Sequence, residues 1–131
     1  MNPETKAEAA AKRTILLAED NIPTAEVTAE ILADFGYQVI LAANGEEAVT
    51  LARQHLPGLI LMDVQMPHMD GLEATRLLKA DPRTAAIPVI CLTAFAMEKD
   101  VAMCLEAGAI RHLSKPVPYD KLGEILGHYW P

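Results

Sequence analysis

Leu59-Ile60-Leu61-Met62-Asp63 is the stretch that determines the fold. Four consecutive apolar residues are typical of a short strand buried on both faces, and here a carboxylate closes the run. Polar residues follow three further apolar runs in the same way. These are Ile15-Leu16-Leu17-Ala18 before Glu19-Asp20, Val89-Ile90-Cys91-Leu92 before Thr93, and Ala109-Ile110-Arg111-His112-Leu113 ahead of Lys115-Pro116. The repeated pattern predicts buried strands with chemically active groups at their ends.

Short apolar runs alternate with segments of helical spacing along the whole chain. The runs over 14–18, 37–42, 58–62, 87–92 and 109–113 predict buried strands. The expected apolar helix faces are Val27, Ile31, Leu32 and Phe35; Ala48, Leu51 and Ala52; Leu77 and Leu78; Met97, Val101, Cys104 and Leu105; and Leu122, Ile125, Leu126 and Tyr129. This alternation predicts a (βα)5 domain, in which a parallel sheet has helices on both faces and right-handed crossovers.

Turn and capping residues mark where the predicted helices begin and end. Asn44-Gly45-Glu46-Glu47 and Asp70-Gly71-Leu72-Glu73 both have the form of a capping box. Pro23 suits the first turn of the first helix, while Gly36 and Gly108 suit helix ends. These signals separate the strands from the helices that follow them.

Length and composition exclude several classes of protein. The chain has 131 residues, 51% of them hydrophobic, and a net charge of -7, which suits one compact acidic domain. Clustered basic residues, a signal-peptide core and a bilayer-length apolar run are all missing from the sequence. We therefore expect a cytoplasmic protein with no direct nucleic-acid or membrane partner. Residues 1–12 are expected to be a leader or linker remnant, and residues 13–131 the domain.

Five polar side chains that are far apart in sequence are expected at one place. All strands of an open parallel sheet with helical crossovers end on one edge, and ligands bind there. The side chains concerned are those of Glu19, Asp20, Asp63, Thr93 and Lys115. Asp63 could instead have been the start of the next helix, but Asp70-Gly71 already supplies that signal. Thr93 could equally be an ordinary β-branched strand residue.

The combination of these groups points to metal-assisted phosphoryl transfer. Mg²⁺ prefers oxygen ligands, and Asp20, Asp63 and a backbone carbonyl would form part of its coordination shell. Adjacent side chains on an extended segment point in opposite directions, so Glu19 is expected to act through water. Three carboxylates are balanced only by Lys115 together with the cation. Thr93 would donate its hydroxyl to a phosphoryl oxygen, and the small Ala94 would let the backbone approach.

Other catalytic signatures do not occur in the sequence. The chain contains neither G-x-x-x-x-G-K-[ST] nor G-x-G-x-x-G, so nucleotide binding through either loop is unsupported. Motifs for a serine or cysteine nucleophile are also missing. Cys91 and Cys104 are expected to be small core residues rather than a disulfide or a metal site.

Four motifs together resemble the receiver domain of bacterial two-component response regulators over roughly residues 13–130. They are Ile15-Leu16-Leu17-Ala18-Glu19-Asp20-Asn21, Leu61-Met62-Asp63-Val64-Gln65-Met66-Pro67-His68-Met69-Asp70-Gly71, Leu92-Thr93-Ala94 and Ser114-Lys115-Pro116. The resemblance implies a flavodoxin-like three-layer sandwich with a five-stranded parallel sheet in the order 2-1-3-4-5.

The resemblance also implies roles for individual residues. Asp63 would be the phosphoacceptor, with Lys115 and Thr93 beside it and with Val64 and Ala94 binding the phosphoryl group. The expected ligands of Mg²⁺, or of Mn²⁺ as a substitute, are Asp20, Asp63 and the backbone carbonyl of Gln65, with Glu19 acting through water. Thr93 and His112 would form the switch, although receivers usually carry Tyr or Phe in place of His112. Structural roles would fall to Pro67, Gly71 and Pro116, the last of these in a cis peptide bond.

The function that follows from the resemblance is a phosphorylation-controlled switch without separate substrate turnover. The phosphoryl donor would be a histidine kinase or a phosphotransfer protein. The downstream effector would bind the surface of the fourth helix, fifth strand and fifth helix. The chain could be a single-domain regulator or the excised receiver of a hybrid histidine kinase. Two alternatives stay open, namely a phosphorylation-independent pseudo-receiver adaptor and, with less support, an aspartate-nucleophile phosphatase, which usually has an acid where Gln65 stands.

Overall fold

The computed structural model describes residues 13–94 and 98–129 and contains one parallel five-stranded sheet. The strands lie in the order β2-β1-β3-β4-β5, so the predicted order is confirmed. Their bounds are β1 Thr14–Ala18, β2 Gln38–Ala42, β3 Leu59–Asp63, β4 Val89–Thr93 and β5 Arg111–Ser114. In register, Ala18 is opposite Met62, and Asp63 is opposite Leu92. The ends of the central strands are therefore level with one another.

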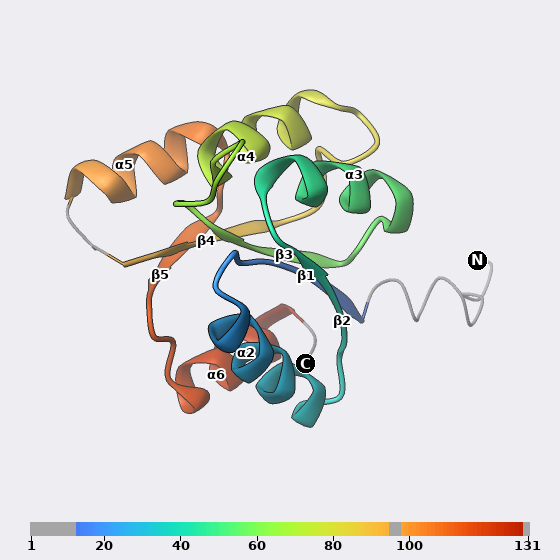
Figure 1. The fold of residues 1–131 in the computed structure, drawn as a ribbon, viewed down its shortest axis with the longest axis vertical. Coiled ribbons are helices and arrows are strands. Elements are labelled where there is room, and N and C mark those ends of the chain that lie inside the picture. The colour runs from blue at the N-terminus through green and yellow to red at the C-terminus, as the bar shows by residue number, and fades with distance from the viewer. Residues whose placement is uncertain (1–12, 95–97, 130–131) are drawn as a thin grey trace.

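Helices cover both faces of the sheet and complete the predicted three-layer sandwich. Their bounds are α2 Ile22–Asp34, α3 Gly45–His55, α4 Gly71–Ala80, α5 Glu98–Ala107 and α6 Tyr119–Tyr129. Figure 1 shows α3, α4 and α5 on one face and α2 and α6 on the other. Within the described residues, the helices contain no segment that is both long enough and apolar enough to cross a bilayer.

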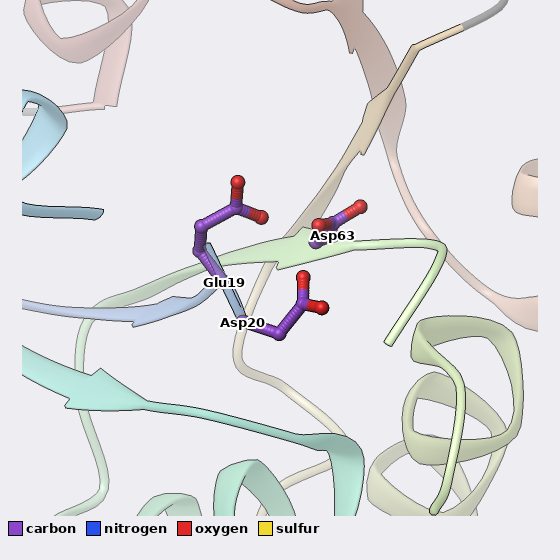
Figure 2. A group of neighbouring side chains, drawn as sticks. All are labelled: Glu19, Asp20 and Asp63. Atoms are coloured by element: carbon purple, nitrogen blue, oxygen red, sulfur yellow. The ribbon is translucent and has the colours of Figure 1, made fainter. Parts of the chain in front are cut away.

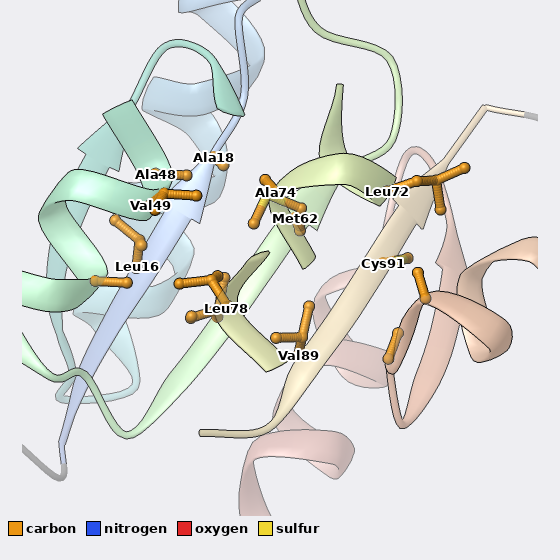
Figure 3. Packing of buried hydrophobic residues seen from close by; sticks show 14 of the residues in the cluster. Leu16, Ala18, Ala48, Val49, Met62, Leu72, Ala74, Leu78, Val89 and Cys91 are labelled. Atoms are coloured by element: carbon orange, nitrogen blue, oxygen red, sulfur yellow. The ribbon is translucent and has the colours of Figure 1, made fainter. Parts of the chain in front are cut away.

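Alternating strand residues build two hydrophobic clusters, one on each face of the sheet. Leu16, Met62 and Val89 pack with Ala48 and Leu78 under α3 and α4, as Figure 3 shows. The other cluster comprises Ile15, Leu17, Leu32, Tyr37, Leu59, Leu61, Ile90, Leu92, Leu113, Leu122, Ile125 and Leu126. Cys91 and Cys104 are free, buried thiols, as expected for small core residues.

The predicted helix ends are confirmed by hydrogen bonds and by backbone conformation. Asn44 accepts a hydrogen bond from the amide of Glu47 at 2.8 Å, and Asp70 accepts one from the amide of Glu73 at 2.9 Å. Gly36 follows α2 with φ 92°, a left-handed conformation that glycine adopts without steric cost. These residues mark the starts of α3 and α4 and the end of α2.

Two expectations about burial were wrong. The strands predicted over 37–42 and 109–113 were expected to be buried, but β2 and β5 are the edge strands of the sheet. Leu41 and Ile110 are each 45% exposed, although Ala42 and Leu113 are buried. Val27 and Leu105 were assigned to apolar helix faces, yet they are 58% and 49% exposed. Hydrophobic spacing does not reveal which strand lacks a neighbour or which part of a helix face lies beyond the sheet.

The predictions for Met97 and for residues 1–12 concern positions outside the described residues.

Two glycines hold the loop between β3 and α4 close to its neighbours. The amide of Gly71 donates to the carbonyl oxygen of Val64 at 3.0 Å, and the amide of Gly45 donates to that of Met69 at 3.0 Å. A Cβ atom on Gly71 would lie 2.0 Å from the carbonyl oxygen of Asp63. One on Gly45 would lie 2.3 Å from the carbonyl oxygen of Met69. Side chains are therefore excluded at both positions, and the loop after Asp63 is held against the body of the domain.

Ile60→Ala tests the central position of β3. Ile60 is fully buried, so truncation removes apolar contacts and leaves a cavity. We expect the free energy of unfolding to fall by about 2–5 kcal/mol, measured by urea denaturation. The matched control is Ile22→Ala, because Ile22 is 68% exposed and its truncation should change stability by less than about 0.5 kcal/mol. Equal effects of the two substitutions would contradict this account of the core.

Candidate functional site

Three carboxylates meet at the carboxyl edge of the sheet. Glu19 and Asp20 follow β1, and Asp63 is the last residue of β3. One oxygen from each of the three lies within 4.8 Å of the others. Figure 2 shows the side chains of Glu19 and Asp20 leaving the chain in different directions, with Asp63 opposite both. The predicted convergence of these acids is therefore present in the structure.

Lys115 lies between two of these carboxylates. Its Nζ atom is 3.0 Å from Oδ2 of Asp63 and 3.2 Å from Oε1 of Glu19. The backbone amide of Lys115 donates to the carbonyl oxygen of Thr93 at 2.8 Å, and the Lys115–Pro116 peptide bond is cis. The pairing with Asp63 was expected from the sequence, whereas the contact with Glu19 was not.

The pKa values of Glu19 and Lys115 differ from those of the free side chains. The side chains of Glu19 and Asp63 are only 3% and 4% exposed. Burial raises the pKa of Glu19 to about 7, helped by the hydrogen bond and negative charge of Asp63 and opposed by Lys115. Burial also lowers the pKa of Lys115, but its bonds and charge interactions with Asp63 and Glu19 outweigh this and leave that pKa raised. Lys115 therefore stays positively charged next to the Glu19 carboxyl, whose ionisation is disfavoured by burial.

Thr93 places a buried hydroxyl beside Asp63. Among the described residues, its Oγ1 is the buried side-chain oxygen that has no hydrogen-bond partner. A cavity of about 40 Å³ next to it is lined by Asp63, Val64, Gln65, Thr93, Ala94 and Asp100. Buried polar groups normally have a partner, so an unpartnered one requires an explanation. The hydroxyl is free to bind a group that enters next to Asp63.

The loop after β3 places backbone polar groups around the same carboxylate. The amide of Gln65 donates to Oδ1 of Asp63 at 3.1 Å, and that of Val64 donates to the carbonyl oxygen of Leu92 at 3.1 Å.

Asp100 at the start of α5 also lines the cavity beside Thr93, and the sequence analysis did not identify it. Its place in the first helix after Thr93 is the signal that could have indicated it.

The acid cluster has the composition and spacing of a site for a hard divalent cation. Mg²⁺ binds oxygen ligands at about 2.0–2.1 Å, so oxygens on opposite sides of one ion are roughly 4 Å apart. The oxygens of Glu19, Asp20 and Asp63 lie within 4.8 Å of one another, which suits an ion bound directly by two of the acids and through water by the third. Asp20 is exposed, which leaves an open approach on that side.

His112 does not lie with the other expected residues. It is on β5, in register with Cys91, and it lines a hollow with Arg111, Lys121, Glu124 and His128 along the α6 edge. This hollow is distinct from the cavity beside Thr93 and Asp63. In this conformation, His112 therefore does not contribute to the acid site.

The raised pKa of Glu19 predicts a pH-dependent stability. Between its ordinary pKa of 4.5 and about 7, Glu19 holds its proton in the folded protein but loses it in the unfolded chain. The folded state then binds more protons, so without divalent cations its free energy of unfolding should fall as pH rises from about 4.5 to about 7. Glu19→Gln should flatten this slope in urea titrations with EDTA. An unchanged slope in the variant would contradict the assignment.

Comparisons with known proteins agree with this geometry. A family model described as the response regulator receiver domain matches residues 15–126. The polar-differentiation response regulator DivK of Brucella anthropi is 38% identical over 117 residues, which are 89% of this chain and 95% of DivK.

Two similar solved structures are receiver domains of histidine kinases. The receiver domain of a sensor histidine kinase from Pseudomonas aeruginosa PAO1 is 39% identical with a TM-score of 0.83, over 88% of this chain and 95% of that one. Its crystal structure has a magnesium ion coordinated in the active-site cleft. The receiver domain of a signal transduction histidine kinase from Syntrophus aciditrophicus is 39% identical with a TM-score of 0.81, and 88% of each chain is covered.

Proposed function

Because this chain belongs to the response regulator receiver domain family, we propose that it accepts a phosphoryl group on the carboxylate of Asp63. The donor is a phosphohistidine of a histidine kinase or a phosphotransfer protein. The observation that carries the proposal is the surroundings of Asp63. Its buried carboxylate contacts the Lys115 ammonium at 3.0 Å, belongs to a three-acid cluster, and lies beside the unpartnered hydroxyl of Thr93.

The transfer is a displacement at phosphorus. A carboxylate oxygen of Asp63 forms the new O–P bond, the P–N bond to the donor histidine breaks, and its electron pair stays on the imidazole nitrogen. Asp20, Asp63 and the Gln65 carbonyl would hold Mg²⁺ or Mn²⁺, with Glu19 acting through water, and the cation would supply charge neutralisation to the phosphoryl oxygens. Lys115 pairs with Asp63 beforehand and with the phosphoryl group afterwards.

Thr93 and Ala94 complete the proposed phosphoryl site. The Thr93 hydroxyl can donate to a phosphoryl oxygen because it has no competing partner among residues 13–94 and 98–129. Ala94 is exposed next to the cavity, and its small side chain leaves the backbone accessible. Movement of Thr93 toward the phosphoryl group would bias a two-state equilibrium that the surface of α5, β5 and α6 reports to a partner.

The output of this switch is binding to another protein. We propose that a downstream effector recognises the surface of α5, β5 and α6, and that the protein works in the cytoplasm. Residues 13–131 would form the receiver, either as a single-domain regulator or as part of a hybrid histidine kinase. Receiver domains are generally signalling switches rather than enzymes with substrate turnover. The acid cluster with Lys115 and Thr93 disfavours the adaptor alternative, and Gln65, where the phosphatase usually has an acid, disfavours the phosphatase alternative.

Asp63→Asn should abolish phosphorylation by a small phosphodonor. With acetyl phosphate and Mg²⁺, we expect acid-labile phosphate to fall to background, because the carboxamide lacks the nucleophilic oxygen. The matched control is Asp70→Asn on the same loop, since Asn caps a helix as well as Asp does. Undiminished labelling of Asp63→Asn, measured by mass spectrometry of the intact protein, would refute the assignment.

Asp20→Asn should weaken cation binding. A cation that binds only the folded state stabilises it by about 2.7 kcal/mol at a concentration 100 times its Kd. We expect Mg²⁺ to raise the melting temperature of the wild-type protein above its value in EDTA, and this rise should be largely lost in Asp20→Asn. Glu30→Gln on α2 removes the same charge from an exposed position outside the cluster and should keep the rise. Equal Mg²⁺ responses in the two variants would place the cation elsewhere.

A further inference from the structure

A groove of about 310 Å³ opens between the first half of α2 and the segment that joins β5 to α6. Its floor is formed by Leu17, Leu61 and Leu92, which are almost fully buried residues of three neighbouring strands. Val27 of α2 and Val117 line its sides. Val27 is 58% exposed although it is apolar, so the groove leaves hydrophobic surface open to water. This volume is at the lower end of the range for small-molecule pockets, about 300–1,000 Å³.

Polar groups reach the lining of this apolar groove at a few positions. Glu19 and Lys115 are shared with the acid site, and Thr24 and Thr28 come from α2. A mainly apolar lining with a few polar groups is the usual construction of a small-molecule site. Nearby, the carboxylates of Asp20 and Asp63 outnumber the one ammonium of Lys115 even when Glu19 holds its proton, so the surroundings disfavour an anion.

We propose that this groove binds a small, uncharged, mainly apolar organic molecule with one polar group. Its apolar body lies over the leucine floor and against Val27, and its polar group hydrogen-bonds with Lys115, Glu19 or a threonine hydroxyl. Because Lys115 and Glu19 line both the groove and the acid site, occupancy of one site changes the affinity of the other, and this coupling is reciprocal. Binding itself needs neither phosphorylation nor a cation and is independent of the proposed function.

The neutral fluorophore N-phenyl-1-naphthylamine tests the groove in the full chain with EDTA present. We expect its fluorescence to rise and to saturate at one probe per chain. Val27→Trp fills the groove from an exposed position and should weaken binding at least tenfold. Leu105→Trp on α5 introduces the same ring at a comparably exposed apolar site and should leave binding unchanged. Circular dichroism establishes that both variants are folded.

A charged relative of the probe tests the electrostatic part of the argument. 1-Anilinonaphthalene-8-sulfonate has the same rings with one negative charge added, and we expect it to bind at least tenfold more weakly. The proposal is overturned if the neutral probe does not saturate, if Val27→Trp binds it as well as the wild type, or if the anion binds equally well. It is also overturned if the chain is a dimer that Val27→Trp dissociates, since the groove would then be covered by a second copy.

Discussion

The ammonium group of Lys115 holds the acid site together. It bridges Asp63 at the end of β3 and Glu19 directly after β1, two buried acidic side chains. A buried charge without a partner is strongly unfavourable, so this bridge makes the close approach of the two acids possible. The remaining features of the edge are arranged around that contact. They are the exposed Asp20, the unpartnered hydroxyl of Thr93 and the loop after Asp63.

The parallel sheet explains how residues nearly a hundred positions apart come into contact. β1, β3 and β4 are neighbours and run in the same direction, so the residues that follow their last apolar positions share one edge. The core on both faces fixes the strands, and the hydrogen bond between Lys115 and Thr93 ties the fifth strand's end to the fourth. The positions of the site residues therefore depend on how the hydrophobic core packs on both faces of the sheet.

Much of this arrangement could be predicted from sequence because central strands and capping residues have strong local signals. The strand ends at Asp63 and Thr93 and the caps at Asn44 and Asp70 are examples. Strand order came from family resemblance rather than periodicity. The exposure of Val27 could not be predicted, because it depends on how α2 and the β5–α6 segment diverge. The contact between Lys115 and Glu19 depends on side-chain geometry that spacing does not encode.

Gly45 and Gly71 determine which residues of the loop after Asp63 can be substituted. The loop after Asp63 takes its shape from main-chain contacts to these two residues, which exclude any side chain. An exposed position in that loop, such as Gln65, can then be exchanged without altering the path of the backbone. Mutation can thus change the side chains around Asp63 while the scaffold stays constant.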